Sequence, residues 1–249
     1  MPTALITGAT AGLGAAFARR LAADGFTLVL VARDEHRLAE SAQQLKLRYG
    51  GAVETLPADL STEDGLTAVE SRIRDGVDLL VNNAGFGHPE GFLRTPVADE
   101  LRMLKLHCEA VLRLTLAALP GMKSRGRGGV INVASVAGFF TRGTYSASKA
   151  WVINFSESAA AEVGHPRVKV MALCPGFVRT EFHDRAGMDT AGIPGFLWLK
   201  ADNVVAAAMR DLALGRVVSI PDPRYKAIVA VGKFVPRNLA AQVSARIGR

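Results

Sequence analysis

The sequence predicts an α/β protein built on a doubly wound parallel β-sheet of about seven strands, flanked by helices. Short apolar runs alternate with longer segments of helical periodicity along the whole chain, a pattern typical of parallel sheets with crossover helices. A glycine-rich turn directly follows the first apolar run. The sequence shows no internal repeat, low-complexity segment or linker, so we expect residues 1–249 to form a single domain.

Length and composition are those of an ordinary globular protein. The chain has 249 residues, of which 49% are hydrophobic and 21% charged, and it is long enough to bury a large core. No apolar run approaches the roughly twenty residues of a membrane span. Met1–Ile6 leads straight into a strand, without the basic region that opens a signal peptide. Cys108 and Cys174 stand in apolar contexts at no metal-like spacing, which favours buried reduced thiols, a cytoplasmic protein and no metal site.

The net charge of +7 is concentrated at the C-terminal end. Leu212–Arg249 contains seven basic residues and one acidic residue, Asp222. No helix-turn-helix, zinc or aromatic-stacking motif accompanies this charge, so we expect a solvated basic tail and no nucleic-acid partner. The tail, residues 225–249, also carries apolar side chains that could pack on the body, on a partner subunit or on an anionic membrane surface. Its apolar stripe is short and irregular and Pro236 limits any helix, which favours packing on protein over membrane contact.

The chain opens with a short buried strand at Ala4–Thr7, a glycine turn at Gly8–Gly14 and a helix at Ala15–Ala23. Glycines allow a tight turn that approaches a pyrophosphate closely, and the helix N-terminus supplies N–H donors and a positive dipole. The spacing is G-x-x-x-G-x-G instead of the commoner G-x-G-x-x-G. This arrangement predicts nucleotide binding.

The second strand, Phe26–Ala32, ends at Arg33, and Asp34 is expected to cap the following helix, Glu35–Tyr49. In a nucleotide-binding βαβ unit the end of this strand faces the adenosine ribose. An acidic residue there would bind the 2′-hydroxyl, whereas an arginine suits a 2′-phosphate. Arg33 therefore favours NADP(H) over NAD(H). The alternative is a solvated charge at the end of the strand.

The remaining elements alternate in the same way. We expect strands at Val53–Pro57, Val77–Val81, Val130–Ala134, Val168–Leu173 and Arg216–Ile220. Helices are expected after the third strand, capped by Ser61 or Thr62, and over Val204–Leu214, opened by Asp202 or Asn203. The other helical regions are Pro96–Lys123, interrupted near His107, and Tyr145–Val163.

Three side chains form a candidate catalytic group: Ser135, Tyr145 and Lys149. Tyr145 and Lys149 are four residues apart on one face of a helix. A phenol has a reference pKa of about 10, and a nearby ammonium favours the phenolate, which moves the tyrosine towards acid–base work at neutral pH. Ser135 follows the apolar run Val130–Ala134, where a strand ends, and can hydrogen-bond a carbonyl oxygen. The alternative for the Tyr–Lys pair is an ordinary helix-surface contact.

Together these motifs resemble the short-chain dehydrogenase/reductases of the single-domain type, over nearly the whole chain. The resemblance is carried by T-G-x-x-x-G-x-G at Thr7–Gly14, N-N-A-G at Asn82–Gly85, Ser135, Tyr145-x-x-x-Lys149, and Pro175-Gly176 followed by Thr180. It implies a Rossmann-type fold, an oxidoreductase that uses NADP(H), and a homodimer or homotetramer.

The resemblance also implies a role for each matching position. Ser135 holds the substrate oxygen, Tyr145 gives it a proton as hydride arrives from the nicotinamide, and Lys149 binds the ribose hydroxyls and favours the tyrosinate. The residues implied to bind the cofactor are Thr7, Gly8, Thr10, Gly12, Leu13, Gly14, Arg33, Asp59, Leu60, Asn83, Ala84, Gly85, Tyr145, Lys149, Pro175, Gly176, Val178 and Thr180.

One position departs from the family pattern. His107 stands where the family usually has an asparagine that completes a proton-relay site, and an imidazole is larger and titrates near neutrality. A catalytic relay role for His107 is therefore a hypothesis. The alternatives are a shifted alignment, or a buried hydrogen-bonding histidine without a catalytic part.

The segment 181–200 varies in this family and usually covers the substrate. An apolar mouth favours a bulky hydrophobic carbonyl compound over a sugar, and the resemblance leans towards long-chain 3-oxoacyl reductases. The cluster Phe196–Leu199 could instead pack in the core or at an oligomer interface. The apolar residues of the segment are Phe182, Met188, Ile193, Pro194, Phe196, Leu197, Trp198 and Leu199, and Phe86, Phe92, Phe139, Phe140 and Phe177 follow other strand ends.

The sequence therefore predicts an NADP(H)-dependent oxidoreductase that interconverts a hydrophobic ketone or aldehyde and its alcohol, with Tyr145 as general acid/base. One alternative is a nucleotide-binding regulatory or scaffold protein without turnover. Another is a basic membrane-peripheral protein, which depends on the tail alone. The presence of Ser135, Tyr145 and Lys149 favours the enzyme.

Overall fold

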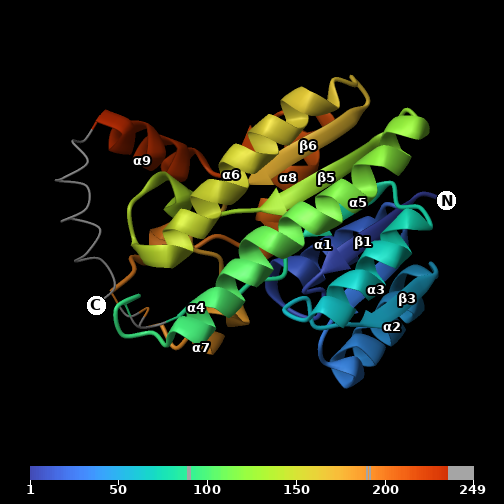
Figure 1. The fold of residues 1–249 in the computed structure, drawn as a ribbon, viewed down its shortest axis with the longest axis horizontal. Helices are drawn as coiled ribbons and strands as arrows, with labels where there is room; N and C mark the ends of the chain where they lie inside the picture. Colours follow the sequence, from blue (N-terminus) through green and yellow to red (C-terminus); the bar gives the residue numbers. More distant parts are fainter. Residues whose placement is uncertain (89–90, 189, 191, 235–249) are drawn as a thin grey trace.

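A seven-stranded parallel sheet forms the centre of the molecule, with helices on both faces (Figure 1). The structure is a computed structural model that describes residues 1–88, 91–188, 190 and 192–234. The strand order is β3-β2-β1-β4-β5-β6-β7, which confirms the predicted doubly wound, Rossmann-type architecture. The strands are β1 (Thr3–Thr7), β2 (Thr27–Ala32), β3 (Val53–Pro57), β4 (Leu79–Asn82), β5 (Gly128–Val133), β6 (Val168–Leu173) and β7 (Val218–Ser219).

The helices divide between the two faces of the sheet, and each set packs on its own apolar cluster. One cluster gathers side chains of α1, α2 and α8 under one face, and the other gathers those of α3, α5 and α6 under the opposite face. The helical elements are α1 (Gly12–Ala23), α2 (Glu35–Tyr49), α3 (Glu63–Arg74), α4 (Val97–Leu104), η1 (Lys105–Glu109), α5 (Ala110–Ser124), η2 (Val136–Phe139), α6 (Gly143–Val163), α7 (Glu181–Arg185), η3 (Gly195–Leu197), α8 (Ala201–Ala213) and α9 (Pro223–Phe234).

Two of the predicted helix caps are confirmed. The carboxylate of Asp34 accepts a hydrogen bond from the backbone N–H of Arg37 at 3.0 Å, and α2 covers the predicted residues. Of the two candidates for α3, Thr62 is the cap, since its hydroxyl accepts from the N–H of Gly65 at 3.1 Å. Each bond satisfies one of the N–H groups that a helix start leaves without an intrahelical partner.

The predicted start of α8 is wrong. Lys200 stands at the N-cap without a side-chain hydrogen bond, and the helix begins at Ala201. Asp202 lies inside the first turn, where its carboxylate complements the helix dipole and pairs with Arg19 of α1 at 2.6 Å. An acidic residue near a helix start can serve either purpose, and the sequence pattern does not separate them.

Other boundaries differ by a few residues. Helix α1 begins at Gly12 and not at Ala15, so the last glycines of the turn belong to its first turn. Strand β4 is shifted towards the C-terminus of the expected run, and β7 contains only Val218–Ser219 because it pairs with β6 at two positions. Edge strands are often short, which limits pairing with other chains.

The expected interruption near His107 is confirmed and takes the form of a π-helical turn. Helices α4 and α5 continue into one another through η1, whose five residues include His107. Such single π turns inside α-helices occur frequently at functional sites. The turn directs His107 inward, where only 1% of its surface is exposed.

The described beginning of the basic tail packs on the protein body. Tyr225 and Val229 of α9 are buried. The hydroxyl of Tyr225 donates to the carbonyl of Leu197 at 2.8 Å and accepts from the N–H of Phe177 at 3.0 Å. Residues 235–249, which include Pro236, lie outside the described part of the chain. Within the described part, no helix combines the length and apolar character needed to cross a membrane.

The two thiols differ in burial. Cys174 is fully buried, as predicted, whereas Cys108 is only partly buried, so the expectation for Cys108 is wrong. Cys108 lies in the π turn η1, next to His107. Neighbouring residues of a helix point in different directions. Cys108 therefore faces partly outward when His107 faces inward.

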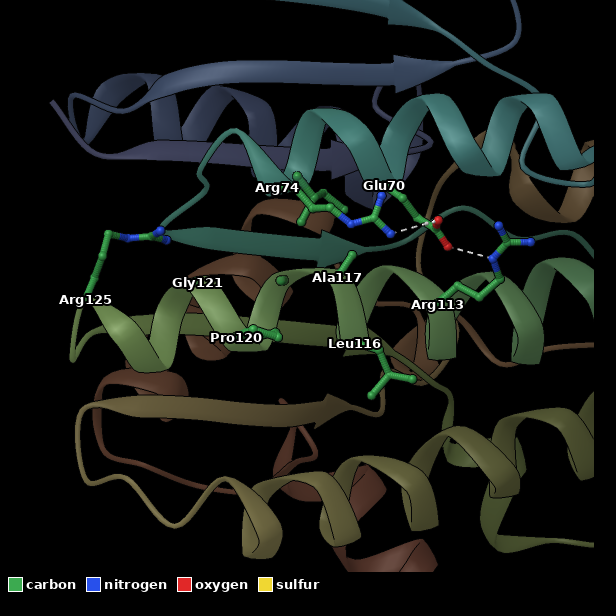
Figure 2. A pocket seen from close by; sticks show the side chains of 10 residues that line it. Glu70, Arg74, Arg113, Leu116, Ala117, Pro120, Gly121 and Arg125 are labelled. Atoms are coloured by element: carbon green, nitrogen blue, oxygen red, sulfur yellow. Dashed lines mark hydrogen bonds and ion pairs between the residues drawn. The ribbon is translucent and has the colours of Figure 1, made fainter.

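A hollow of about 360 Å³ lies between α3 and α5, lined in part by an ion-pair cluster (Figure 2). Arg74 of α3 and Arg113 of α5 both point to Glu70, with Arg113 Nε at 2.6 Å and Arg74 Nη2 at 3.3 Å from its oxygens. Arg113 also binds both oxygens of Glu63. None of the residues lining the hollow is among the predicted site residues. The cluster therefore connects two helices and has no evident part in the site.

We expect Glu70→Gln to lower the melting temperature at pH 7 by about 2–4 °C, the shift for roughly 1 kcal/mol in a chain of this size. The hydrogen bond from Arg113 is the main cause that holds the pKa of Glu70 below its usual 4.5, against the opposite effect of burial. A carboxylate with a lowered folded-state pKa stabilises the fold above its unfolded-state pKa and loses that effect as the pH falls. The difference in melting temperature between Glu70→Gln and the wild type should therefore become smaller below about pH 4.5.

Thermal unfolding followed by circular dichroism from pH 7 to pH 3 measures this difference. Glu40→Gln, on the exposed side of α2, is the control and should leave the melting temperature unchanged. Equal melting temperatures of Glu70→Gln and wild type at pH 7 would contradict the assigned role of the cluster.

Candidate active site

The predicted site residues gather at one edge of the sheet. Because all seven strands are parallel, their carboxyl ends meet at the same edge. The glycine turn follows β1, Asn83–Gly85 follows β4, Ser135 follows β5 and Pro175-Gly176 follows β6. Helix α6, which carries Tyr145 and Lys149, begins at this edge. The fold thus brings together segments that lie more than 150 residues apart in the sequence.

The glycine turn is closed tightly against the end of β4. Gly8 has a φ of +65°, which side chains rarely adopt. A Cβ atom at Gly14 would overlap the carbonyl of Gly8 and come within 2.7 Å of Asn83 Nδ2. The amide of Asn83 donates to the carbonyls of Thr7 and Gly8, at 2.9 and 3.2 Å. Glycine is therefore required at both positions for reasons of backbone geometry and space.

Thr7 joins β1 to β4 from inside the protein. Its hydroxyl accepts hydrogen bonds from the N–H groups of Asn83 and Ala84, both at 2.9 Å, and is 3.4 Å from the carbonyl of Val81. Thr7 is 1% exposed. In this structure its side chain therefore supports the glycine turn and does not face an open space.

The start of α1 has the properties of an anion site. Its N-cap is Ala11, without a side-chain hydrogen bond, and its first turn contains no acidic residue. The N–H groups and positive dipole of this helix end are therefore not neutralised by the helix's own side chains. Thr10 and Leu13, on either side of this point, are partly exposed.

The adenosine side of the predicted site is defined by Arg33 and Asp59. Arg33 is exposed at the end of β2. Burial alone would raise the pKa of Asp59, but hydrogen bonds from Ser61 and the charges of Arg33 and Arg102 hold it below its usual 3.8. Asp59 is thus ionised at neutral pH. Leu60 is buried in the core, which leaves its backbone as the part that can face a ligand.

The three candidate catalytic residues are close to one another. Ser135 caps η2 by accepting from the N–H of Ala137 at 3.1 Å. Lys149 Nζ lies 5.8 Å from the centre of the Tyr145 ring and donates to the carbonyl of Val133 at 3.0 Å. Lys149 is 6% exposed, and such a buried ammonium requires acceptors of this kind.

Burial dominates the protonation of this group. Although Tyr145 as a residue is half-buried, burial around its hydroxyl raises its pKa to about 12, and a hydrogen bond with Ser135 opposes this shift. Burial also lowers the pKa of Lys149 to about 8. The sequence suggested that Lys149 would favour the phenolate, whereas the largest effect on the pKa of Tyr145 here is burial. Tyr145 is therefore a protonated phenol at neutral pH, which suits a proton donor.

His107 connects the wall of the site to the helix that carries Tyr145. The N–H of Phe86 donates to His107 Nε2 at 3.2 Å. The hydroxyl of Ser148 donates to the carbonyl of Tyr145 at 2.8 Å, so at 3.0 Å from His107 Nδ1 it must accept the ring proton. These contacts assign a neutral imidazole that carries its proton on Nδ1.

The surroundings of His107 favour this neutral form. Burial is the largest cause that holds the pKa of His107 well below its usual 6.5, and the charges of Lys149 and His88 act in the same direction. Both ring nitrogens already have protein partners. The geometry thus describes a positioning residue, and the relay role stays a hypothesis that mutation can test.

The residues after β6 pack closely on other parts of the site. A Cβ atom at Gly176 would overlap the ring of Tyr225, so this turn requires glycine. Pro175 and Val178 are buried. Thr180 lies directly against Gly12, whose added Cβ would be 3.3 Å from Thr180 Cβ. The segment that leads into α7 therefore touches the glycine turn.

Aromatic side chains flank Tyr145. Phe182 of α7 has its ring centre 6.3 Å from that of Tyr145 and lies against Gly87. Phe86 packs next to His107, with ring centres 6.0 Å apart. By contrast, Phe196 is 64% exposed. Phe182, and not the cluster Phe196–Leu199, thus supplies the apolar surface beside Tyr145.

Three contributors to the site were not anticipated from the sequence. Ser148 accepts the proton of His107, Tyr225 supports the turn at Phe177, and Arg37 binds Glu181 of α7. Ser148 lies three residues after Tyr145 on the same helical face, and this spacing could have indicated that it contributes to the site. The partners of Tyr225 and Arg37 are too distant in sequence for any pattern to indicate. Among the described residues, no group of three or more His, Cys, Asp or Glu side chains could hold a metal ion.

Comparison with known proteins places the chain in a family. A family profile described as short chain dehydrogenase matches residues 2–190. The match agrees with the sheet topology, the glycine turn and the Ser–Tyr–Lys group described above. The chain belongs to the short chain dehydrogenase family.

Individual relatives show how far the similarity extends. A very-long-chain 3-oxoacyl-CoA reductase of Pyrenophora tritici-repentis is 37% identical over 71% of this chain and 55% of its own length. The chain spans 55–60% of the length of the first curated relatives it matches.

Two solved structures match over nearly their whole length. A short-chain dehydrogenase from Sphingobium yanoikuyae, in complex with NADPH, has a TM-score of 0.85 and 36% identity, covering 94% of both chains. A bulky-bulky ketone specific alcohol dehydrogenase from Comamonas testosteroni has a TM-score of 0.80 and 30% identity, covering 95% of this chain and 96% of its own.

We expect His107→Asn to lower kcat by about tenfold while the pH profile between pH 6 and 8 keeps its shape. The shorter amide cannot hold both Phe86 and Ser148, but a ring that is neutral throughout this range contributes no titration step. Initial rates from pH 5.5 to 9 measure both effects, with the exposed His36→Asn as control. Loss of a titration step near neutrality in His107→Asn would show that the ring ionises during turnover.

Proposed function

We propose that the protein is an NADP(H)-dependent oxidoreductase that interconverts a hydrophobic ketone or aldehyde and its alcohol. The observation that carries this proposal is the position of Tyr145, hydrogen-bonded to Ser135 and adjacent to Lys149, at the sheet edge that also holds the glycine turn. This is the arrangement needed to protonate a carbonyl oxygen beside a bound nucleotide.

The residues present fit a dinucleotide. The glycine turn leaves no room for side chains, and the uncapped start of α1 offers N–H donors to a pyrophosphate. When bound, the nicotinamide supplies or accepts the hydride. The chain supplies the rest. Ser135 donates a hydrogen bond to the substrate oxygen, Tyr145 transfers its proton to that oxygen as negative charge develops, and the Lys149 ammonium stabilises the tyrosinate left behind.

Arg33 supports NADP(H) as the preferred cofactor. Its guanidinium is exposed at the end of β2, near the ionised Asp59. A guanidinium matches a phosphate in charge and geometry and has no comparable advantage for a ribose hydroxyl. The solved relative from Sphingobium yanoikuyae, in complex with NADPH, agrees with this choice.

A hydrophobic substrate is supported by the side chains beside Tyr145. Phe86 and Phe182 provide apolar surface at the reacting end of the site. Two relatives are named as a very-long-chain 3-oxoacyl-CoA reductase and as a bulky-bulky ketone specific alcohol dehydrogenase, and both names describe large carbonyl compounds. We therefore propose a bulky ketone, with a long acyl chain or an aryl group, as the substrate class.

We also propose that the protein acts in the cytoplasm as a homodimer or homotetramer. Val97, Leu101 and Leu116 on α4 and α5 are 56–73% exposed. Exposed apolar side chains along one helical region are typical of a subunit interface.

Tyr145→Phe should abolish turnover of a hydrophobic ketone with NADPH, by at least about a thousandfold, because the proton donor is lost. Binding of NADPH should change little, since the phenol hydroxyl is a small part of the cofactor site. Oxidation of NADPH at 340 nm measures turnover, and protein fluorescence measures binding. NADPH binding by the wild type without turnover of any ketone in a broad panel would favour the alternative, a nucleotide-binding regulatory protein.

Arg33→Ala should raise the Kd of NADPH by about 10- to 100-fold, the range for loss of a charge-assisted hydrogen bond. The Kd of NADH should stay within about twofold, because NADH lacks the 2′-phosphate. Fluorescence titration with both nucleotides provides the measurement, with Arg20→Ala in the last turn of α1 as control. Equal weakening of both nucleotides would mean that Arg33 does not select for the phosphate.

A further inference from the structure

An ion pair bridges two segments of the site that the family motifs do not connect. Arg37 lies in the first turn of α2, four residues after Arg33, and Glu181 is the first residue of α7. Arg37 Nη2 lies 3.1 and 3.2 Å from the two carboxylate oxygens of Glu181, and Nη1 lies 3.4 Å from one of them. The contact joins residues 144 positions apart in the sequence.

The glycine turn takes part in this contact. Arg37 Nη2 also donates to the carbonyl of Thr10 at 3.4 Å. The residue before Glu181, Thr180, packs on Gly12 of the same turn. One guanidinium therefore touches both the turn and the segment that leads to Phe182, the apolar neighbour of Tyr145.

The geometry is more specific than that of an ordinary surface pair. Arg37 is partly buried, with 36% of its side chain exposed, against 51% for Glu181. A guanidinium with two N–H groups on one carboxylate and a third partner on the backbone has a defined orientation, which a single flexible contact does not. Arg37 thus fixes the distance between the start of α2 and the start of α7.

We propose that Arg37 and Glu181 are positioning residues that clamp α7 over the nucleotide site. The clamp holds Thr180 against the glycine turn and Phe182 beside Tyr145, so that the cofactor is retained between the turn and α7. This inference rests on the proposed nucleotide site at the glycine turn. It adds that α7 is held over that site from the adenosine side. The residue that holds it is Arg37, whereas the residue proposed to select the 2′-phosphate is Arg33.

A competing role for Arg37 makes the opposite prediction. If Arg37 were a second ligand of the 2′-phosphate, Glu181 would compete with that phosphate for the guanidinium. Removal of the Glu181 charge would then strengthen NADPH binding and leave NADH unaffected. In the clamp, removal of the charge weakens both nucleotides equally, because α7 covers the part that they share.

The test compares Glu181→Gln, Arg37→Gln and the exchanged pair Arg37→Glu with Glu181→Arg in one chain. We expect each single variant to raise the KM of NADPH and of NADH by the same factor, about two- to fivefold for a pair with this exposure, with kcat unchanged. The exchanged pair should recover most of the loss, which would assign the loss to the Arg37–Glu181 ion pair. Hydrogen exchange of backbone amides in 181–188 should be faster in the single variants and slower again in the exchanged pair.

Glu54→Gln provides the matched control. It removes the exposed pair between Glu54 and Arg72, at 2.9 Å, which joins β3 to α3 and does not border the glycine turn. It should leave the KM of both nucleotides unchanged. Tighter NADPH binding in Glu181→Gln, or nucleotide constants equal to wild type in both single variants, overturns the clamp and leaves the proposed function intact. Absence of nucleotide binding in the wild type overturns both.

Discussion

The site depends on the hydrogen bonds that Thr7 and Asn83 make between the ends of β1 and β4. The buried hydroxyl of Thr7 accepts hydrogen bonds from two backbone N–H groups after β4. The side-chain amide of Asn83 donates to two backbone carbonyls at the start of the glycine turn. Each group is satisfied, so a change in one strand end would leave buried polar atoms without partners. These hydrogen bonds place Gly85 against His107. His107 in turn forms a hydrogen bond with Ser148 in α6. The orientation of α6, which carries Tyr145 and Lys149, therefore follows from contacts that begin in the first strand.

Burial has opposite effects on the two ionisable partners in α6. It keeps the phenol of Tyr145 protonated and makes the ammonium of Lys149 easier to deprotonate, with a pKa of about 8. In the proposed reduction both groups act in their protonated forms, because the phenol would give the proton and the ammonium would stabilise the phenolate. Of the two groups, Lys149 is therefore the first to lose its proton as the pH rises. Cys108 and Cys174 lie close to Lys149 and oppose the lowering of its pKa.

Local chemistry accounts for what the sequence predicted correctly. The bounds of α2 followed from the cap at Asp34 and from Gly50, which adopts a left-handed conformation at the helix end. The glycine turn and Ser135 were located at strand ends because each follows a recognisable apolar run. The start of α8 was misplaced because Asp202 can serve as a cap or as a first-turn partner of Arg19. The raised pKa of Tyr145 comes from burial, which the spacing of residues in the sequence does not show. Whether the named residues bind a cofactor stays a prediction.

The segment between Phe177 and Lys200 is held by contacts of different strength. Near its start and end, at Phe177 and Leu197, it is bound by the buried hydroxyl of Tyr225, and after its end by the exposed pair of Asp202 with Arg19. Between these points, α7 depends on the partly exposed pair of Glu181 with Arg37. Exposed ion pairs contribute less than buried hydrogen bonds and are screened by salt. The hydrogen bonds of Tyr225 are shielded from solvent, so a charged ligand would not weaken them. Phe177 and Leu197 would therefore stay in place while α7 responds to such a ligand. The proposed dinucleotide would bring negative charge to that end, beside Arg37 and the glycine turn, where the segment is held by an ion pair instead of a buried hydrogen bond.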